Sequence, residues 1–179
     1  TGGLVAFMLG DLNRKLDMQL PHDQEVAKTV AEGTSKYYRG IDTKSLDDEL
    51  LAEHATQLLQ IAKAYRELGL YESGKETANQ ARMIRTQLHG EEAVEVGEVL
   101  SIEGVLTMQL GGVDDGMAEL RRGVELLDGK IPEEDDRFVI ALGNLGEALA
   151  SQGKPTEGVA YIRRAIAIRE AKPGGYPLQ

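Results

Sequence analysis

The sequence predicts an all-α protein built as an α-solenoid of helical hairpins, and three observations support this fold class. Gly69, Gly111 and Gly153 are spaced 42 residues apart, and a second glycine stands five residues after each of them. The leucines at positions 58, 100 and 142 follow the same spacing. Aromatic residues make up only 4% of the chain, so the core must be aliphatic, which suits closely packed helices better than a β-sandwich. A fixed repeat of this length is typical of solenoids, in which each unit buries its apolar face against its neighbours.

The composition narrows the classes of function. With 30 acidic and 20 basic residues the net charge is −10, so the molecule repels phosphate backbones and we expect no nucleic-acid partner. The absence of Cys excludes a disulfide framework, a thiol nucleophile and a Cys-ligated zinc. The apolar runs are far shorter than the roughly 20 residues that cross a bilayer, so we expect no membrane insertion. Because the sequence begins Thr1-Gly2-Gly3, without Met or a basic leader, we interpret it as part of a longer protein.

Residues 1–44 are expected to form a divergent N-terminal helical hairpin. Leu4, Met8 and Leu12 belong to an amphipathic stripe in residues 4–20. Pro21 is suited to the first position of a second helix, which Gly40 would end. This pair does not follow the glycine spacing, so we interpret it as a candidate cap of the solenoid.

Residues 45–172 are predicted to form three repeats, about 45–88, 91–129 and 132–172, each with a first helix, a tight turn and a second helix. In the first repeat, Ser45 and Asp48 resemble a capping box, and the helices would span about 45–68 and 71–88. In the second repeat the helices would span roughly 91–110 and 113–127. In the third, Pro132 precedes an acidic first helical turn, residues 133–136. The last helix would stop before Pro173, where a C-terminal tail, residues 173–179, begins; no segment shows the alternation of a strand.

The repeating unit resembles the tetratricopeptide repeat (TPR). The first repeat fits its pattern with Leu58, Ile61, Ala62, Tyr65, Gly69, Tyr71, Ala78 and Ala81. The third fits with Leu142, Leu145, Gly146, Gly153, Ile162 and Ala165. The second departs from it, because Glu103 and Thr107 replace a Leu and a Tyr. The resemblance covers residues 46–171 and implies a right-handed TPR superhelix.

Two further resemblances refine this interpretation. The long period and the Ala-Leu-Gly-Asn-Leu-Gly segment at residues 141–146 are similar to the kinesin-light-chain-like branch of the family. Residues 7–12, Phe-Met-Leu-Gly-Asp-Leu, followed by Tyr37-Tyr38, look like the junction that precedes TPR arrays in large bacterial signalling proteins. The second resemblance implies an attached kinase, nucleotide cyclase or protease-like module.

Small residues should allow the two helices of each repeat to approach closely. The expected facing pairs are Ala62 with Gly74, Gly104 with Gly116, and Gly146 with Gly158. A glycine inside a helix costs roughly 0.5–1 kcal/mol relative to alanine, so packing must offset that cost. We therefore expect the Gly146→Leu substitution to unfold the third repeat by overpacking.

No catalytic, metal-binding or cofactor-binding constellation is evident. Gly69 and Gly74-Lys75 have the spacing of a phosphate-binding loop, but Glu76 stands where that loop needs Ser or Thr. Three histidines, at 22, 54 and 89, share no ligand spacing and are interpreted as single surface residues. The acidic run at 133–136 lacks the central Gly of an EF-hand loop and fits a helix start better. We therefore expect no enzyme activity and no cofactor.

The TPR resemblance implies a concave surface, lined by the first helices, on which a peptide or a helix of a partner lies. The candidate residues of this groove are Leu59, Gln60, Lys63, Arg66, Ile102, Val105, Met108, Asn144 and Glu147, and the same surface would include Ile140 and Gly143. The Lys and Asn pairs of a carboxylate clamp are missing, because Val105 aligns with Lys63 and Ile102 with Gln60. Asn144 aligns with the Asn that contacts peptide backbone in the kinesin-light-chain-like branch. The apolar centre favours a hydrophobic or amphipathic segment.

Two other surfaces offer alternatives. Arg121-Arg122 and Arg163-Arg164 lie one period apart and form a basic stripe, which either pairs with neighbouring acids or binds an acidic partner. The apolar residues of the last helix spread around it, so we expect that end to be covered by the tail at residues 176–179, by a second copy of the chain or by more of a longer protein. We predict a protein–protein interaction scaffold within a larger signalling or regulatory protein. The alternatives are a peptide-sensing domain of an attached enzyme, or a self-assembly module that dimerises through the C-terminal helix. The sequence favours a cytoplasmic location without specifying the compartment.

Overall fold

The computed structural model describes residues 21–171, and this part of the chain contains seven α-helices, one short 3-10 helix and no strand. The helices are α2 (Pro21–Arg39), α3 (Asp48–Glu67), α4 (Tyr71–His89), α5 (Val94–Gln109), α6 (Val113–Leu127), α7 (Asp136–Ser151) and α8 (Pro155–Ala171), with the 3-10 helix η1 at Thr43–Ser45. The all-α prediction is confirmed. The helix expected in residues 4–20 and the tail at 173–179 lie outside the described residues.

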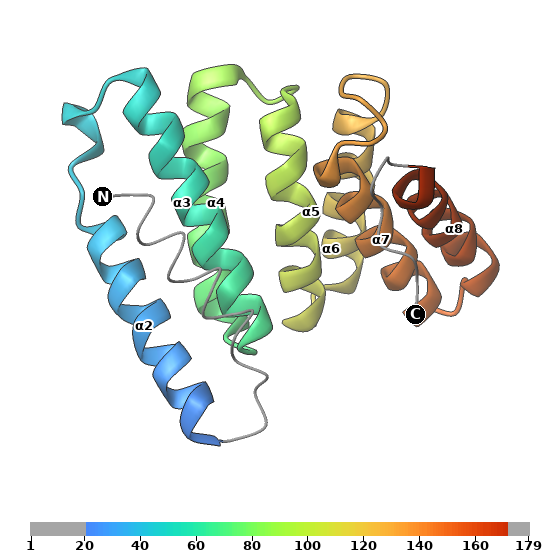
Figure 1. The fold of residues 1–179 in the computed structure, drawn as a ribbon, viewed down its shortest axis with the longest axis horizontal. Coiled ribbons are helices and arrows are strands. Elements are labelled where there is room, and N and C mark those ends of the chain that lie inside the picture. The colour runs from blue at the N-terminus through green and yellow to red at the C-terminus, as the bar shows by residue number, and fades with distance from the viewer. Residues whose placement is uncertain (1–20, 172–179) are drawn as a thin grey trace. The chain divides into compact units, whose positions relative to one another are not determined.

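The chain divides into two compact units, residues 1–88 and residues 89–179. Helices α2 to α4 belong to the first unit and α5 to α8 to the second (Figure 1). The division falls between the first and second predicted repeats. The repeat boundaries and the handedness of the superhelix stay predictions.

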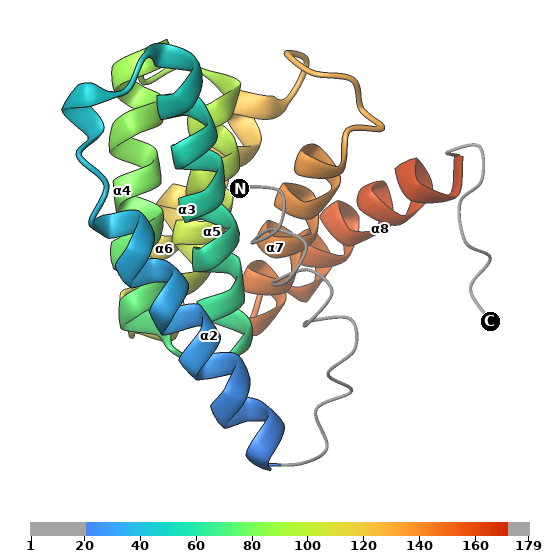
Figure 2. The ribbon, with the colours of Figure 1, turned by 60° about the vertical axis from the view of Figure 1, so that its left-hand side comes forward.

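In the first unit, α2 lies alongside α3, and α3 and α4 form a helical hairpin (Figures 1 and 2). Ala27 and Ala31 give α2 a buried side of small residues. The buried Tyr65 of α3 donates its hydroxyl hydrogen bond to the Ala31 carbonyl oxygen, with 3.4 Å between the two oxygens. A buried hydroxyl needs such a partner, so the tyrosine of the repeat pattern also ties α2 to α3.

The prediction that all histidines lie on the surface was wrong for His54. Its side chain is only 5% exposed, and its ring lies tilted against that of Tyr38 with 5.7 Å between the ring centroids. Burial lowers the pKa of His54, and its Nδ1 atom has no hydrogen-bond partner. His54 therefore packs as a neutral ring between α3 and α2. His89 is exposed, and the side chain of His22 lies outside the described part of the chain.

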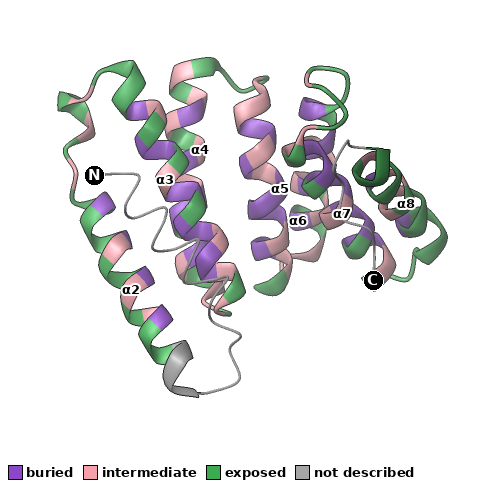
Figure 3. Ribbon diagram, viewed as in Figure 1, coloured by how far each residue is buried: buried purple, intermediate pink, exposed green. Residues whose placement is uncertain are grey.

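In the second unit, α5 and α6 form one hairpin and α7 and α8 form the next, and α7 packs against both α5 and α6. The core between the hairpins is aliphatic with one aromatic ring, and its largest members are Leu120, Leu127, Phe138, Leu142, Leu145 and Leu149. Figure 3 shows that α8 is mostly exposed, unlike α7. The last hairpin is thus buried on one side only.

The recurring first glycines end the first helices, as predicted. Gly69, Gly111 and Gly153 have positive φ angles of 72°, 90° and 75°, a region that residues with a Cβ atom rarely adopt. In each turn the following residue donates its backbone N–H to the carbonyl five residues earlier, at 2.9 to 3.0 Å. This pattern is the Schellman motif. Of the two glycines with the spacing of a phosphate-binding loop, Gly69 therefore ends α3, and Gly74 is a buried residue of α4.

The predicted close contact between the two helices of a hairpin is confirmed in the second unit. A Cβ atom at Gly104 would lie 2.7 Å from the Gly116 carbonyl oxygen, and one at Gly146 would lie 2.8 Å from the Gly158 carbonyl oxygen. Side-chain carbons do not come this close to a backbone oxygen. The helices of these hairpins can therefore touch only because both positions lack a side chain.

Three helix starts differ from the sequence prediction. Ser45 lies in η1, and Asp47 caps α3 instead, with its carboxylate accepting from the Leu50 backbone N–H at 2.9 Å. Helix α5 begins at residue 94 rather than near 91, and α7 begins at residue 136 after the cap Asp135. At the N-terminus of a helix, aspartate accepts a backbone hydrogen bond as readily as serine does. The sequence alone therefore could not show which of several neighbouring residues caps each helix.

Candidate functional site

The exposed side of α7 carries a row of side chains suited to contact with a partner. Ile140, Gly143, Asn144 and Glu147 are spaced three and four residues apart, which places them on one side of the helix. Ile140 is 38% exposed, Glu147 is exposed, and the other two are half-buried. A Cβ atom at Gly143 would meet nothing within 4 Å. We call these four residues the α7 face, and its centre is open.

Asn144 also has a role inside the molecule. Its Nδ2 atom donates a hydrogen bond to the Ser101 carbonyl oxygen of α5 at 2.9 Å. This bond joins two neighbouring first helices of the second unit. A side-chain amide has two N–H donors and an oxygen with two acceptor lone pairs, so the bond to Ser101 uses one of its four hydrogen-bonding positions. The predicted peptide contact of Asn144 stays a prediction, and it would share the amide with this internal bond.

The candidates on α5 lie deeper than a binding surface requires. Ile102 is 1% exposed, and Val105 is half-buried against the core of the second unit. Met108 is half-buried and lies over α6, since a Cβ atom at Gly116 would come 2.5 Å from Met108 Cγ. These three residues contribute to packing, and the accessible candidates of the second unit are on α7.

The candidates on α3 belong to the first unit. Leu59 is fully buried, Gln60 is exposed, and Lys63 and Arg66 are half-buried. The accessible ones, Gln60, Lys63 and Arg66, are spaced three residues apart along the helix and present polar and positive groups. The structure therefore brings the nine candidates together in two separate sets, one in each unit.

The basic stripe is largely paired with neighbouring acids. Arg121 Nη2 lies 3.0 Å from Glu157 Oε1, which links α6 to α8. Arg122 forms ion pairs with Glu92 and with Glu125. Three of the four stripe arginines are engaged in this way, the third being Arg164.

Arg164 has the most extensive contacts of the stripe. Its Nη2 atom lies 3.0 Å from Asp128 Oδ1 and 2.7 Å from Glu133 Oε1, and its guanidinium stands 4.9 Å from the centroid of the Phe138 ring. The hydrogen bonds to Asp128 and Glu133 raise the pKa of Arg164. Arg163 differs, because no ion pair or hydrogen bond joins it to any residue of the described range. Pairing with neighbouring acids, one of the two alternatives that the sequence left open for the stripe, is thus observed for three of its four arginines.

Residues 21–171 contain no cluster of three or more His, Asp or Glu side chains that could hold a metal ion. None of the helices in this range is long and apolar enough to cross a membrane.

Residues 139–172, which cover most of α7 and all of α8, match the family model of the tetratricopeptide repeat. The match covers the length of a single repeat and falls within the third predicted repeat. The TPR match lies in the hairpin whose glycines make the close contact between Gly146 and Gly158. It also includes the four residues of the α7 face.

Solved structures with the same fold extend the similarity to nearly the whole chain. The crystal structure of BtubC (BKLC) from P. vanneervenii is 21% identical, with a TM-score of 0.59 over 99% of this chain and 75% of that one. The crystal structure of a putative kinesin light chain of Podosopora anserina, with nearly identical TPR-like repeats, is 16% identical, with a TM-score of 0.56 over 93% of this chain and 84% of that one. No curated protein sequence matches the chain. The predicted TPR fold, similar to that of kinesin-light-chain proteins, is confirmed.

Proposed function

We propose that this chain is a protein–protein interaction scaffold that binds a peptide or helical segment of a partner through its first helices. The observation that carries the proposal is the α7 face, where a position without a side chain, Gly143, lies open between the exposed Ile140 and Glu147. The TPR-type fold supports it, because stacked helical hairpins present extended surfaces that such proteins use for binding. We assign no catalytic role to the chain.

The chemistry of the α7 face indicates what kind of segment would fit. Ile140 offers an apolar contact, and Glu147 offers a negative charge one helical turn beyond the glycine. The missing side chain at Gly143 lets a partner's backbone or a bulky side chain come close to the helix. The remaining donor and acceptor positions of Asn144 suit the N–H and C=O groups of an extended chain. We propose a segment with an apolar anchor and a basic residue directed at Glu147.

The experiment uses a substitution that fills the surface without disturbing the core. Gly143→Trp should block the α7 face, because the space over Gly143 is open. The matched control is Gly33→Trp on α2, where an added Cβ atom also meets nothing within 4 Å. Both variants should keep the helical circular-dichroism signal of the parent, and proteins captured from cells of the source would be identified by mass spectrometry.

We expect partners that the parent and Gly33→Trp retain and that Gly143→Trp loses by about tenfold or more, the loss expected when a bulky group occupies an interface centre. A Glu147→Lys variant should weaken the same partners, because it reverses the charge on the face. Recovery of an identical set of partners with Gly143→Trp would show that the α7 face is not the binding site.

A further inference from the structure

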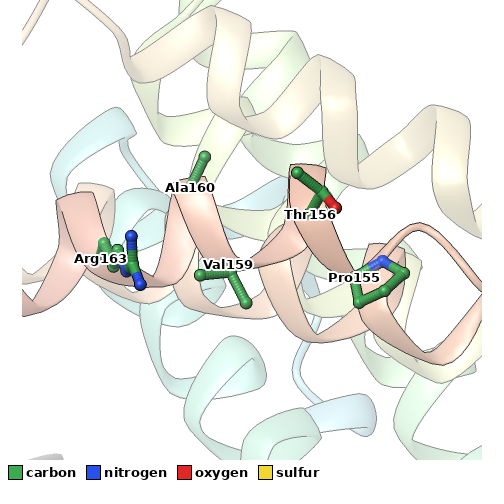
Figure 4. A pocket seen from close by; sticks show the side chains of 5 residues that line it. All are labelled: Pro155, Thr156, Val159, Ala160 and Arg163. Atoms are coloured by element: carbon green, nitrogen blue, oxygen red, sulfur yellow. The ribbon is translucent and has the colours of Figure 1, made fainter.

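The outer side of α8 is a second surface with unusual exposure. Val159 is 40% exposed and Ile166 is 44% exposed, and Arg163 lies between them on the same side of the helix. A hollow of about 400 Å³ lies on this side, and the described residues that line it are Pro155, Thr156, Val159, Ala160 and Arg163 (Figure 4). We call Val159, Arg163 and Ile166 the α8 face.

The repeat assigns each residue of the α8 face to a counterpart 42 positions earlier on α6. The counterparts are Met117, Arg121 and Val124. On α6 this side is covered by the following hairpin: Val124 is only 7% exposed, and Met117 is half-buried against the core that α6 and α7 share. The α8 face is therefore the uncovered equivalent of a surface that, one repeat earlier, holds the next hairpin.

Ion pairs join the second helix of one hairpin to the second helix of the next hairpin along the chain. Arg121 of α6 contacts Glu157, in the first turn of α8 and 36 residues further along the chain, at 3.0 Å. Arg39 at the end of α2 contacts Glu76, in the second turn of α4 and 37 residues further along, also at 3.0 Å. In both units an arginine thus reaches a glutamate near the start of the next second helix. Arg163 is the counterpart of Arg121, and none of the described residues fills the place of that glutamate.

We propose that the α8 face binds a further helical hairpin of the same repeat type. Its first helix covers Val159 and Ile166, as α7 covers α6, and its second helix presents a carboxylate in its first turn to Arg163. The charge of Arg163 and the apolar side chains on both sides of it define this partner. The inference concerns a surface other than the α7 face and does not depend on what binds there.

A second copy of this chain fits the α8 face less well. Arg163 is the middle residue of α8 (Pro155–Ala171). If two copies of α8 paired around a two-fold axis, the two Arg163 side chains would meet near that axis. Like charges placed together at an interface oppose association, so the charge on the face favours an acidic helix over α8 itself.

The test adds a hairpin in register to the full chain. A second copy of residues 130–171 is inserted after Ala171, which places the added copy of Glu157 36 residues after Arg163, the spacing of the Arg121 and Glu157 pair. Because the chain has no Cys, a single Val159→Cys substitution reports exposure through its rate of reaction with a thiol reagent. Met83→Cys, at a position 65% exposed in the first unit, serves as the matched control.

We expect the extended chain to gain helical signal and to slow the labelling of Cys at position 159 by at least about tenfold, as burial in a folded hairpin would, with no change at position 83. Arg163→Glu should restore fast labelling in the extended chain and leave the parent unchanged. Glu157→Arg in the added copy should then slow labelling again by restoring an ion pair. This reversal separates a specific pairing from mere apolar contact.

Three results would overturn the proposal. The first is an added hairpin that stays unfolded, and the second is labelling at position 159 that remains as fast as in the parent. The third is a parent chain that sediments as a dimer in which position 159 is already protected, since a second copy would then occupy the face.

Discussion

The tight contact between α7 and α8 predicts that even one added carbon at Gly146 destabilises the protein. A Cβ atom there would lie 2.7 Å from Ile162 Cγ1 and 2.8 Å from the Gly158 carbonyl oxygen. Carbon atoms in contact normally stand about 3.5–4.0 Å apart, so the Ile162 side chain would have to move. Because the Gly158 oxygen belongs to the backbone, the two helices would also have to separate. Gly146→Ala should therefore behave as an overpacking substitution.

The magnitude follows from two opposing effects. Alanine in a helix interior is favoured over glycine by roughly 0.5–1 kcal/mol, whereas overpacking a close contact costs about 1–3 kcal/mol. The difference between these ranges is about 0–2.5 kcal/mol, so we expect Gly146→Ala to lower the free energy of unfolding by about 1 kcal/mol and by no more than about 2.5 kcal/mol. Gly143 lies on the same helix in open space, so Gly143→Ala should raise it by about 0.5–1 kcal/mol.

The two variants are compared by urea unfolding followed by circular dichroism at the helical band. Both substitutions gain the same helix propensity, so the difference between their changes in the free energy of unfolding gives the cost of overpacking alone. Gly146→Leu, which adds a whole side chain at the contact, should unfold the hairpin of α7 and α8. If Gly146→Ala stabilised the chain as much as Gly143→Ala does, the close glycine contact would not exist in solution and the packing argument would be refuted.

Three further predictions concern single side chains. Burial lowers the pKa of His54 below its usual 6.5. The stability that the neutral His54 ring contributes is therefore present above pH 6.5 and is lost as the pH falls through the pKa of the folded state. In urea unfolding between about pH 7.5 and 5, His54→Phe should remove this part of the pH dependence. Loss of the α3 cap in Asp47→Ala should cost about 1 kcal/mol, whereas Ser45→Ala should cost no more than about 0.5 kcal/mol, and equal effects would contradict the observed cap. Arg164→Ala should cost about 0.5–1 kcal/mol in a salt-dependent way because it loses its ion pairs and its ring contact, while Arg163→Ala in the same melting experiment should change stability by less than about 0.5 kcal/mol.

The fold could be predicted from the sequence because its strongest signals are local. A glycine at a position of positive φ, such as Gly111, ends a helix whatever surrounds it. Glycines that allow two helices to touch, such as Gly104 and Gly116, recur at the same spacing because each hairpin repeats one contact. Helix starts were less certain, since any of several neighbouring Ser or Asp side chains could cap α3.

The candidate site was harder to predict because it depends on how helices face one another. A helix turns by about 100° per residue, so consecutive residues point in different directions. Leu59 is buried, for example, whereas the next residue, Gln60, is exposed. Ile102 aligns with the exposed Gln60 by repeat position but is buried, so the repeat position alone does not determine whether a side chain is exposed. The bond from Asn144 to Ser101 depends on the distance between two helices, which no spacing in the sequence reveals.

Two kinds of contact recur in this fold, the glycine contacts within hairpins and the arginine–glutamate pairs between them, and they contribute differently to stability. Glycine contacts within a hairpin lie in a close-packed interior, where a small change in volume has a large energetic effect. The arginine–glutamate pairs between hairpins are half-exposed, and such pairs contribute only about 0–1 kcal/mol. Their charge is better suited to selecting which hairpin follows, since a like charge at the same place would oppose docking. Arg163 has the position of Arg121 but faces no acid among the described residues. Its charge therefore indicates which kind of hairpin would bind there, although its removal would change the stability of the chain little.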